Sequence, residues 1–221
     1  MACAARATVK HSIMRGRKVG YSSAWVWKEA LPIMFKPFIE EYQQRMHPVL
    51  TELGFTKPTF YHSVLAAKII YPHQGFALII GYDVRDKCIE CDFFRAEREL
   101  LERLGWDEYW ETLQDRTRLP LEQVLSGLGL LALLPYKERV RKKLYASLSP
   151  DPEVGDLYRN LDKAVQRFHK ALRGLPPPDY YPFELIKAQA SLHQRIFQKY
   201  GSLIVGYVKH RFGLSSSTIL Q

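Results

Sequence analysis

The middle of the chain constrains the fold most, because its side chains alternate between apolar and polar with the period of two that is typical of β-strands. Turn-forming residues interrupt the alternation at residues 72–75, which read Pro-His-Gln-Gly, and again at residues 86–87. They divide the stretch into three predicted strands: residues 60–71, 76–85 and 88–95. The first run is apolar on both faces, which predicts a central or doubly covered strand. Short turns join antiparallel neighbours, so the pattern predicts a three-stranded antiparallel meander.

The second hairpin of this meander can be placed in register from its own sequence. With residues 86–87 as a two-residue turn, Tyr82 pairs with Cys91. The same register places Asp83 directly opposite Glu90. One face then carries an apolar set that we expect in the core: Phe76, Leu78, Ile80, Tyr82, Val84, Ile89, Cys91 and Phe93. The other face, which we expect in water, carries Gly81, Asp83, Arg85, Glu90 and Asp92.

A helix is predicted before the strands, over residues 35–53, because apolar side chains recur there at spacings of three and four. Pro37 suits the first turn of this helix. Pro48 lies inside the pattern and should kink or split the helix. Gly54 suits the position just after its end.

Helical periodicity dominates the chain after the strands. Five segments are predicted as helices: residues 96–114, 119–134, 136–148, 151–173 and 183–200. Asp151 and Pro152 form a start signal for the fourth, and Gly201 follows the fifth. Residues 202–208 fit either a strand or a further helical turn. Together with the meander, these helices predict an α+β fold with an N-terminal helix and a helical C-terminal half.

Order and charge divide the chain further. Residues 1–33 show no sustained period and are predicted as a poorly ordered basic N-terminal extension, either a basic arm or an organellar transit peptide. Residues 34–221 are predicted as a single α+β domain. Within it, residues 34–135 hold the first helix, the meander and an apolar helix, and residues 136–221 form a basic helical part. This last part has fifteen Lys and Arg against seven Asp and Glu, a balance that attracts acidic partners.

Several function classes are disfavoured by what the sequence lacks. Three cysteines are too few for a disulfide framework and favour reduced thiols in the cytoplasm. No apolar segment reaches the roughly 20 residues that a membrane-crossing helix needs. The sequence has no P-loop, no dinucleotide-binding glycine pattern and no nucleophile elbow, so we predict no cofactor. These features are more typical of a non-enzymatic protein than of an enzyme.

The polar face of the second hairpin is the weaker of two candidate sites. Asp83, Glu90 and Asp92 project from it, and like charges across a strand pair are destabilising unless they are neutralised. A divalent cation would neutralise them in a metal-dependent hydrolase or nuclease. Arg85 and Lys87 are nearer partners, and a restriction-type nuclease needs a lysine where this chain has Asp92. We therefore predict no metal site and keep the hydrolase as an alternative.

The remaining residues with metal-binding or redox potential are predicted to be structural. Cys88 and Cys91 have the Cys-x-x-Cys spacing, but residues three apart on a strand point to opposite faces. The seven histidines form no metal-binding helix motif. We expect each histidine at the surface or hydrogen-bonded in the core.

A basic stripe is the candidate site that the sequence favours most. Four cations recur at helical spacing within residues 151–173: Arg159, Lys163, Arg167 and Lys170. Three earlier cations strengthen the positive field: Arg139, Lys142 and Lys143. We expect an interaction or regulatory protein that binds an acidic protein through this basic helical face. A DNA- or RNA-binding accessory protein is the first alternative, because phosphates bind such charges as well.

Overall fold

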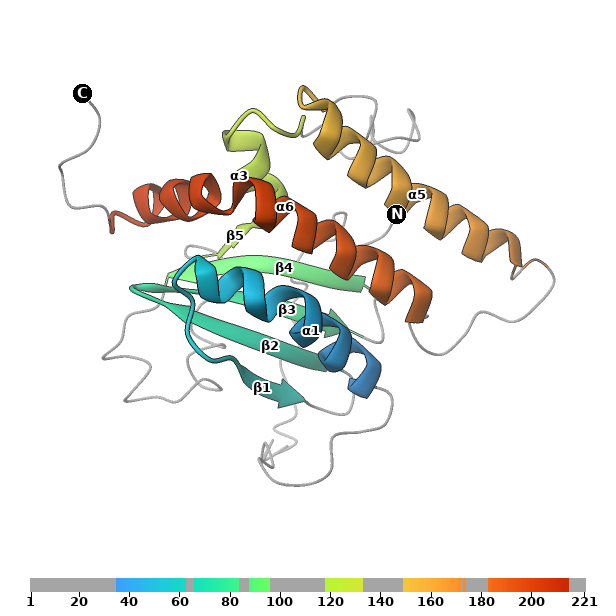
Figure 1. Cartoon of the computed structure of the whole chain (residues 1–221), viewed down its shortest axis with the longest axis horizontal. Helices are drawn as coiled ribbons and strands as arrows, with labels where there is room; N and C mark the ends of the chain where they lie inside the picture. Colours follow the sequence, from blue (N-terminus) through green and yellow to red (C-terminus); the bar gives the residue numbers. More distant parts are fainter. Residues whose placement is uncertain are drawn as a thin grey trace, which may run out of the picture.

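An antiparallel β-sheet with helices on one of its faces forms the architecture (Figure 1). The computed structural model describes residues 35–62, 66–83, 88–95, 118–132, 149–171, 173 and 183–214. Within them, five strands pair in chain order: β1 (Thr59–His62), β2 (Ala66–His73), β3 (Phe76–Asp83), β4 (Cys88–Arg95) and β5 (Arg118–Pro120). The helices described are α1 (Lys36–Glu52), α3 (Leu121–Gly127), α5 (Pro152–Ala171) and α6 (Phe183–Arg211). The α+β prediction is confirmed.

The sheet contains the predicted meander and extends it at both edges. Strands β2, β3 and β4 pair antiparallel, while β1 pairs with β2 and β5 pairs with β4. The predicted first strand is thus two strands, β1 and β2. The prediction joined them because residues 63–65, which read Ser-Val-Leu, contain no glycine or proline to signal a turn. Ile69, Ile70 and Tyr71 of β2 are all buried, although they alternate between the two faces. This agrees with the central position predicted for the run.

The predicted register of the second hairpin is wrong by two residues. Asp83 pairs with Cys88 and Glu90 pairs with Gly81, so Asp83 and Glu90 are not opposite each other. Four residues separate β3 from β4, where we predicted two. A shift of two leaves every side chain on its predicted face. The described members of the predicted core face are accordingly buried: Phe76, Leu78, Ile80, Tyr82, Ile89, Cys91 and Phe93.

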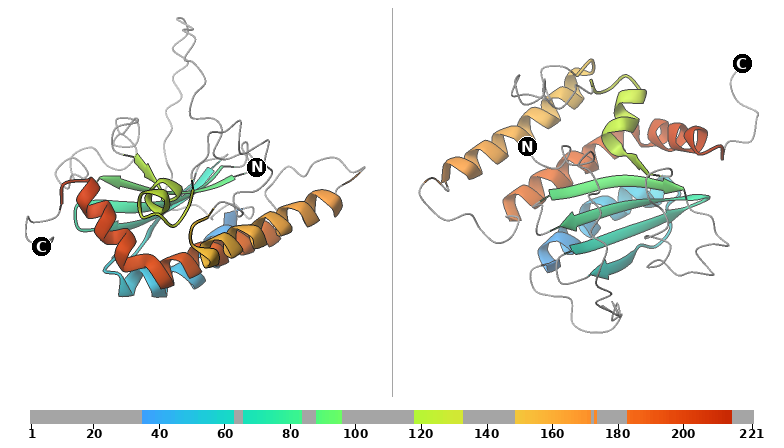
Figure 2. Two further views of the ribbon diagram at one scale, coloured as in Figure 1. Left: turned by 90° about the horizontal axis from the view of Figure 1, so that it is seen from above. Right: turned by 180° about the vertical axis from the view of Figure 1, so that it is seen from behind.

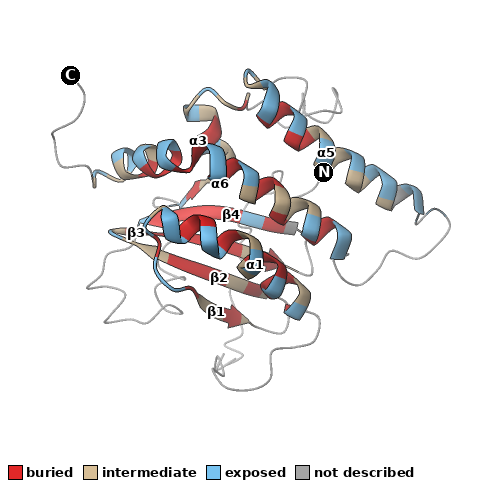
Figure 3. Cartoon of the chain, viewed as in Figure 1, coloured by how far each residue is buried: buried red, intermediate tan, exposed pale blue. Residues whose placement is uncertain are grey.

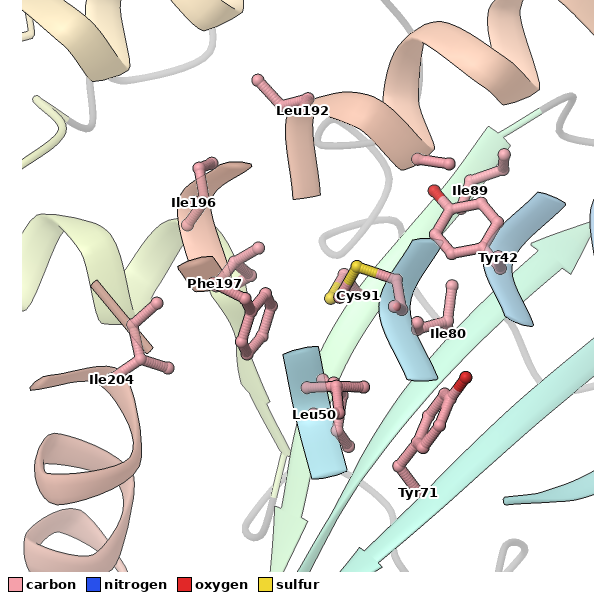
Figure 4. Packing of buried hydrophobic residues seen from close by; sticks show 14 of the residues in the cluster. Tyr42, Leu50, Tyr71, Ile80, Ile89, Cys91, Leu192, Ile196, Phe197 and Ile204 are labelled. Carbon is pink, nitrogen blue, oxygen red and sulfur yellow. The ribbon is translucent and has the colours of Figure 1, made fainter. Parts of the chain in front are cut away.

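This apolar face packs against α1 and α6 to form the core (Figure 3). Phe38 of α1 lies against Tyr82, with ring centroids 5.5 Å apart. Phe197 of α6 lies against Phe93 at 6.2 Å. Figure 4 shows Cys91 among the helix and sheet side chains gathered in this layer. Both helices therefore cover the same face of the sheet, as the view from above in Figure 2 also shows.

The opposite face of the sheet differs from the prediction that it lies in water. Asp92 is only 5% exposed, and Ile79 and Phe94 on the same face are buried as well. Asp83 is half-buried and Glu90 is exposed. The prediction gave weight to the charged residues of this face and too little to the apolar residues between them.

Helix α3 is shorter than the helix predicted over residues 119–134. It ends at Gly127, and Gly129 adopts a positive φ of 71°. The N–H of Leu130 then donates to the carbonyl oxygen of Leu125 at 2.8 Å. This glycine turn satisfies the last carbonyls and stops the helix. The apolar composition of the segment concealed the stop.

Helices α1 and α5 lie close to their predicted bounds. Pro48 does not split α1, which is continuous through its last turns. Helix α5 begins directly after Asp151, whose Oδ1 accepts hydrogen bonds from the N–H groups of Glu153 and Val154 at 2.9 and 3.0 Å. The predicted capping role of Asp151 is confirmed. Three predicted segments lie outside the described residues: the extension 1–33 and the helices 96–114 and 136–148.

Helix α6 continues through Gly201, where the predicted helix ended, and this makes residues 202–208 helical. A Cβ atom on Gly201 would lie 2.4 Å from Leu53 Cδ1. The missing side chain therefore lets α6 come close to the C-terminal end of α1. Gly206, further along the same helix, faces open space.

Gly201→Ala should be less stable than Gly206→Ala by about 1–3 kcal/mol in free energy of unfolding. At Gly206 alanine should stabilise the helix by about 0.5–1 kcal/mol, because outside the helix itself no atom of the described residues lies within 4 Å of its Cβ position. At Gly201 the contact with Leu53 offsets that gain. Equilibrium unfolding in urea measures both variants. Equal stabilities would show that Leu53 turns away freely and that α6 does not need glycine at this position.

Candidate functional site

Helices α5 and α6 pack side by side and antiparallel, and polar contacts join them at one end (Figures 1 and 2). Tyr200 Oη donates to Asp151 Oδ2 at 2.5 Å, and Lys199 pairs with Glu153. The hydrogen bond from Tyr200 is the main cause that lowers the pKa of Asp151. Leu157, one turn further along α5, is buried. The N-terminal half of α5 is thus held on α6.

A groove of about 250 Å³ lies between the two helices. Three leucines form its apolar lining, which we call the floor because two of them are buried: Leu157, Leu161 and Leu192. Small side chains line it and leave the space open: Ala164, Ala188 and Ser191. Its polar side chains are Asn160, Arg167 and Arg195. Both arginines are exposed, whereas Leu157 and Leu192 are buried, so the groove combines two exposed cations with a buried apolar floor.

The groove contains one residue of the predicted basic stripe. Arg167 is exposed, and its Nε donates to the carbonyl oxygen of Lys163 at 3.3 Å. Lys163 and Lys170 are also exposed on α5, whereas Arg159 pairs with Asp156. The stripe is therefore a basic face of α5 with Arg167 at the groove. The other predicted binding residues lie outside the described residues: Arg139, Lys142 and Lys143.

Arg195 of α6 is the groove cation that sequence analysis missed. It follows Ala188 by seven residues and Ser191 by four, which places all three on one helix face. Which face of α6 meets α5 depends on tertiary packing, so this spacing alone could not identify a groove. Within the described residues, neither Arg167 nor Arg195 forms an ion pair.

Two of the three hairpin carboxylates, Glu90 and Asp92, pair with an arginine. Arg118 of β5 places Nη2 2.7 Å from Asp92 Oδ2 and 3.0 Å from Glu90 Oε2. One guanidinium thus neutralises both carboxylates, a role that we predicted for Arg85 and Lys87, which lie outside the described residues. Among the residues that the structure describes, no three His, Cys, Asp or Glu side chains are grouped so as to hold a metal ion.

Burial dominates the charge state of Asp92. It raises the pKa of this carboxyl to about 7, although the charge of Arg118 acts in the opposite direction. Burial also acts to lower the pKa of Arg118, but the charges of Asp92 and Glu90 outweigh it and raise that pKa. Because Arg118 belongs to β5 and both carboxylates belong to β4, this cluster joins two strands.

The described cysteine and the buried histidine have structural environments. Cys91 is a buried free cysteine, and burial raises the pKa of its thiol, which makes it unreactive. The side chain of Cys88 lies outside the described part of the chain. His193 is buried, with its Nδ1 3.2 Å from Tyr42 Oη. This matches the expectation of a hydrogen-bonded core histidine.

Comparison with known proteins finds no family model, no curated protein and no solved structure that matches the chain. Within the described residues, no helix combines the length and the apolar character that crossing a membrane would require. Function must therefore be inferred from the groove and its charges.

Proposed function

We propose that the chain is an interaction or regulatory protein that binds an acidic protein segment through the basic face of α5 and the adjoining groove. The observation that carries the proposal is the combination of exposed cations with an apolar floor. Arg167 and Arg195 lie at the surface of the groove, and Leu192 lies buried in it. An acidic protein segment offers the matching groups, which are carboxylates and aliphatic side chains.

The apolar floor favours a protein over a nucleic acid as the partner. Phosphates require cations but bring no aliphatic groups to such a floor. The aromatic rings of α5 are not exposed for base stacking, since Tyr158 is buried and Phe168 is half-buried. The hydrolase alternative has less support still, because Arg118 pairs with Glu90 and Asp92.

Reversing charge on α5 should weaken binding to an acidic polypeptide at least about tenfold, because attraction becomes repulsion. The test variant is Arg167→Glu combined with Lys170→Glu, and the probe is fluorescent poly-glutamate followed by anisotropy. Lys36→Glu combined with Lys57→Glu is the matched control, because it reverses the same number of charges at exposed positions outside α5. Affinity of the wild-type protein should also fall as salt rises.

The same titrations with duplex DNA and single-stranded RNA separate the alternatives. Tighter binding of either nucleic acid than of poly-glutamate, with the same loss in the α5 variant, would assign the basic face to nucleic acid. Unchanged poly-glutamate binding in the α5 variant would show that this face is not the contact.

A further inference from the structure

We propose that the bound segment is an acidic amphipathic helix lying along the α5–α6 groove, with one carboxylate on Arg167 and a second, about three helical turns away, on Arg195. This rests on the proposed function and deepens it, because it specifies the shape and charge spacing of the partner. The direction of the two helices, the spacing of the arginines and the apolar lining of the groove support it.

The antiparallel packing sets the positions of the two arginines. Tyr200 contacts Asp151 and Lys199 contacts Glu153, so a step forward along α5 matches a step backward along α6. When this pairing is continued residue by residue along both helices, Arg195 lies level with Leu157, which lines the same groove. Arg167 lies about ten residues further along α5, which corresponds to about 15 Å at the rise of a helix. The arginines therefore lie toward opposite ends of the groove.

A partner must carry apolar side chains between its two carboxylates. The lining between the arginines is apolar through Leu161 and Leu192, and Ala164 and Ala188 contribute only small side chains to it. A helix with aliphatic residues at spacings of three and four would place them on this floor. Its acidic residues about ten positions apart would then reach Arg167 and Arg195.

A helical partner fits an apolar floor better than an extended one. An extended segment would bring backbone N–H and C=O groups onto leucine side chains that offer no hydrogen bonds. A helix satisfies these groups internally except at its ends. A third helix in the groove between two packed helices also buries its apolar face without disturbing either. The charges of Arg167 and Arg195, which have no ion-pair partner among the described residues, then select acidic helices over basic ones.

Synthetic peptides of one composition test the spacing. The first is an amphipathic helix with two glutamates about ten residues apart and leucines between them; the second has the glutamates one turn apart. Both are labelled and titrated with the whole chain. We expect the first to bind at least about tenfold more tightly than the second, because only its carboxylates reach both arginines.

Variants of the protein test the two contacts and the groove. Arg167→Glu and Arg195→Glu should each weaken binding of the first peptide at least about tenfold, while Lys36→Glu, exposed on α1 and outside the groove, should weaken it by less than about threefold. Replacing one terminal glutamate of the peptide by lysine should restore binding to one arginine variant and not to the other.

Ala164→Leu fills the groove and should abolish binding of the peptide. Gln166→Leu, which is exposed outside the groove, should not abolish it. Circular dichroism confirms that each variant is folded.

The outcomes separate this inference from the proposed function. If both peptides bind alike and Arg195→Glu leaves their affinity unchanged, the spacing is wrong, although an acidic partner of the α5 face stands. If neither peptide binds but poly-glutamate does, the helical groove ligand is wrong. If no acidic chain binds, both proposals fail.

Discussion

Arg118→Leu should lower the free energy of unfolding by about 3 kcal/mol near pH 8.5 and by no more than about 1 kcal/mol near pH 5.5. The guanidinium pairs with both Asp92 and Glu90. At the higher pH the variant leaves the nearly buried carboxylate of Asp92 without its countercharge. Because the Arg118 side chain is 38% exposed, the loss stays at the lower end of the cost of breaking a buried pair.

The direction of this pH effect follows from the pKa of Asp92. Burial raises it to about 7 even beside Arg118, so near pH 5.5 the folded protein holds this carboxyl largely protonated. There is then little negative charge for Arg118 to neutralise. Removing Arg118 removes an effect that lowers the pKa, so Asp92 in the variant should titrate above 7. The destabilisation therefore develops as the pH rises through neutrality.

Urea unfolding at the two pH values measures this difference, with two controls. Arg118→Lys keeps the charge but cannot span two carboxylates, so its loss should be intermediate. Lys36→Leu removes an exposed ion pair with Glu40, at 3.7 Å, and should cost at most about 0.5 kcal/mol at either pH. A loss in Arg118→Leu that is the same at both pH values would mean that Arg118 acts through the packing of its stem alone.

The hairpin shows what a period-two pattern can and cannot predict. For each described residue of β3 and β4 that we assigned to a face, the assignment is correct, because parity depends only on the alternation of side chains. The pairing partners were wrong by two, because a shift of two preserves that alternation. The turn length is the missing quantity, and Asp86-Lys87 was compatible with both a two-residue and a four-residue connection. A register error of this kind changes a predicted site. The predicted register placed Asp83 opposite Glu90, whereas the observed register separates them.

A glycine ends α3, whereas α6 continues through a glycine, and the local sequence does not distinguish the two cases. Gly129 ends α3 with a positive φ, whereas α6 passes through Gly201 because Leu53 of α1 lies close to it. The first event is local and was concealed by apolar neighbours. The second depends on a residue nearly 150 positions away in the chain, which periodicity cannot identify.

The residues of the candidate site also differ in whether local sequence or contacts between distant elements identify them. Arg167 was predicted because its stripe lies within one helix, where spacing determines the face. Arg195 and Arg118 were missed because their roles arise from contacts between elements that are far apart in sequence. Helical spacing thus located half of the groove, and only the packing of α5 on α6 completed it.

His193→Gln should be less stable than the wild-type protein near pH 7.5. This difference in the free energy of unfolding should shrink by about 2 kcal/mol between about pH 7.5 and pH 5. Burial lowers the pKa of His193 from 6.5 to about 4. The unfolded chain takes up this proton near pH 6.5, and the folded protein takes it up only near pH 4. The stability contributed by the neutral imidazole is therefore present above pH 6.5 and is lost as the pH falls below it.

Asp92 titrates with the opposite sign over the same range. Its folded pKa of about 7 lies above the ordinary value of 3.8, so the stability linked to its protonation increases as the pH falls through 7. The two effects largely cancel in the wild-type protein. Asp92→Asn should remove one of them, and this variant should lose about 2 kcal/mol more than the wild-type protein on acidification, because His193 then acts without opposition.

The double variant decides whether the two groups act independently. His193 lies on the helix side of the sheet, near Tyr42, and Asp92 points to the other face, toward Arg118. Because the sheet separates them and they share no partner among the described residues, their effects should add, and the double variant should regain the pH dependence of the wild-type protein. His210→Gln, exposed on the same helix as His193, is the control and should leave that dependence unchanged. If His193→Gln has the same deficit at both pH values, the folded protein must accept a proton on His193 readily, and the buried neutral imidazole beside Tyr42 is not its state in solution.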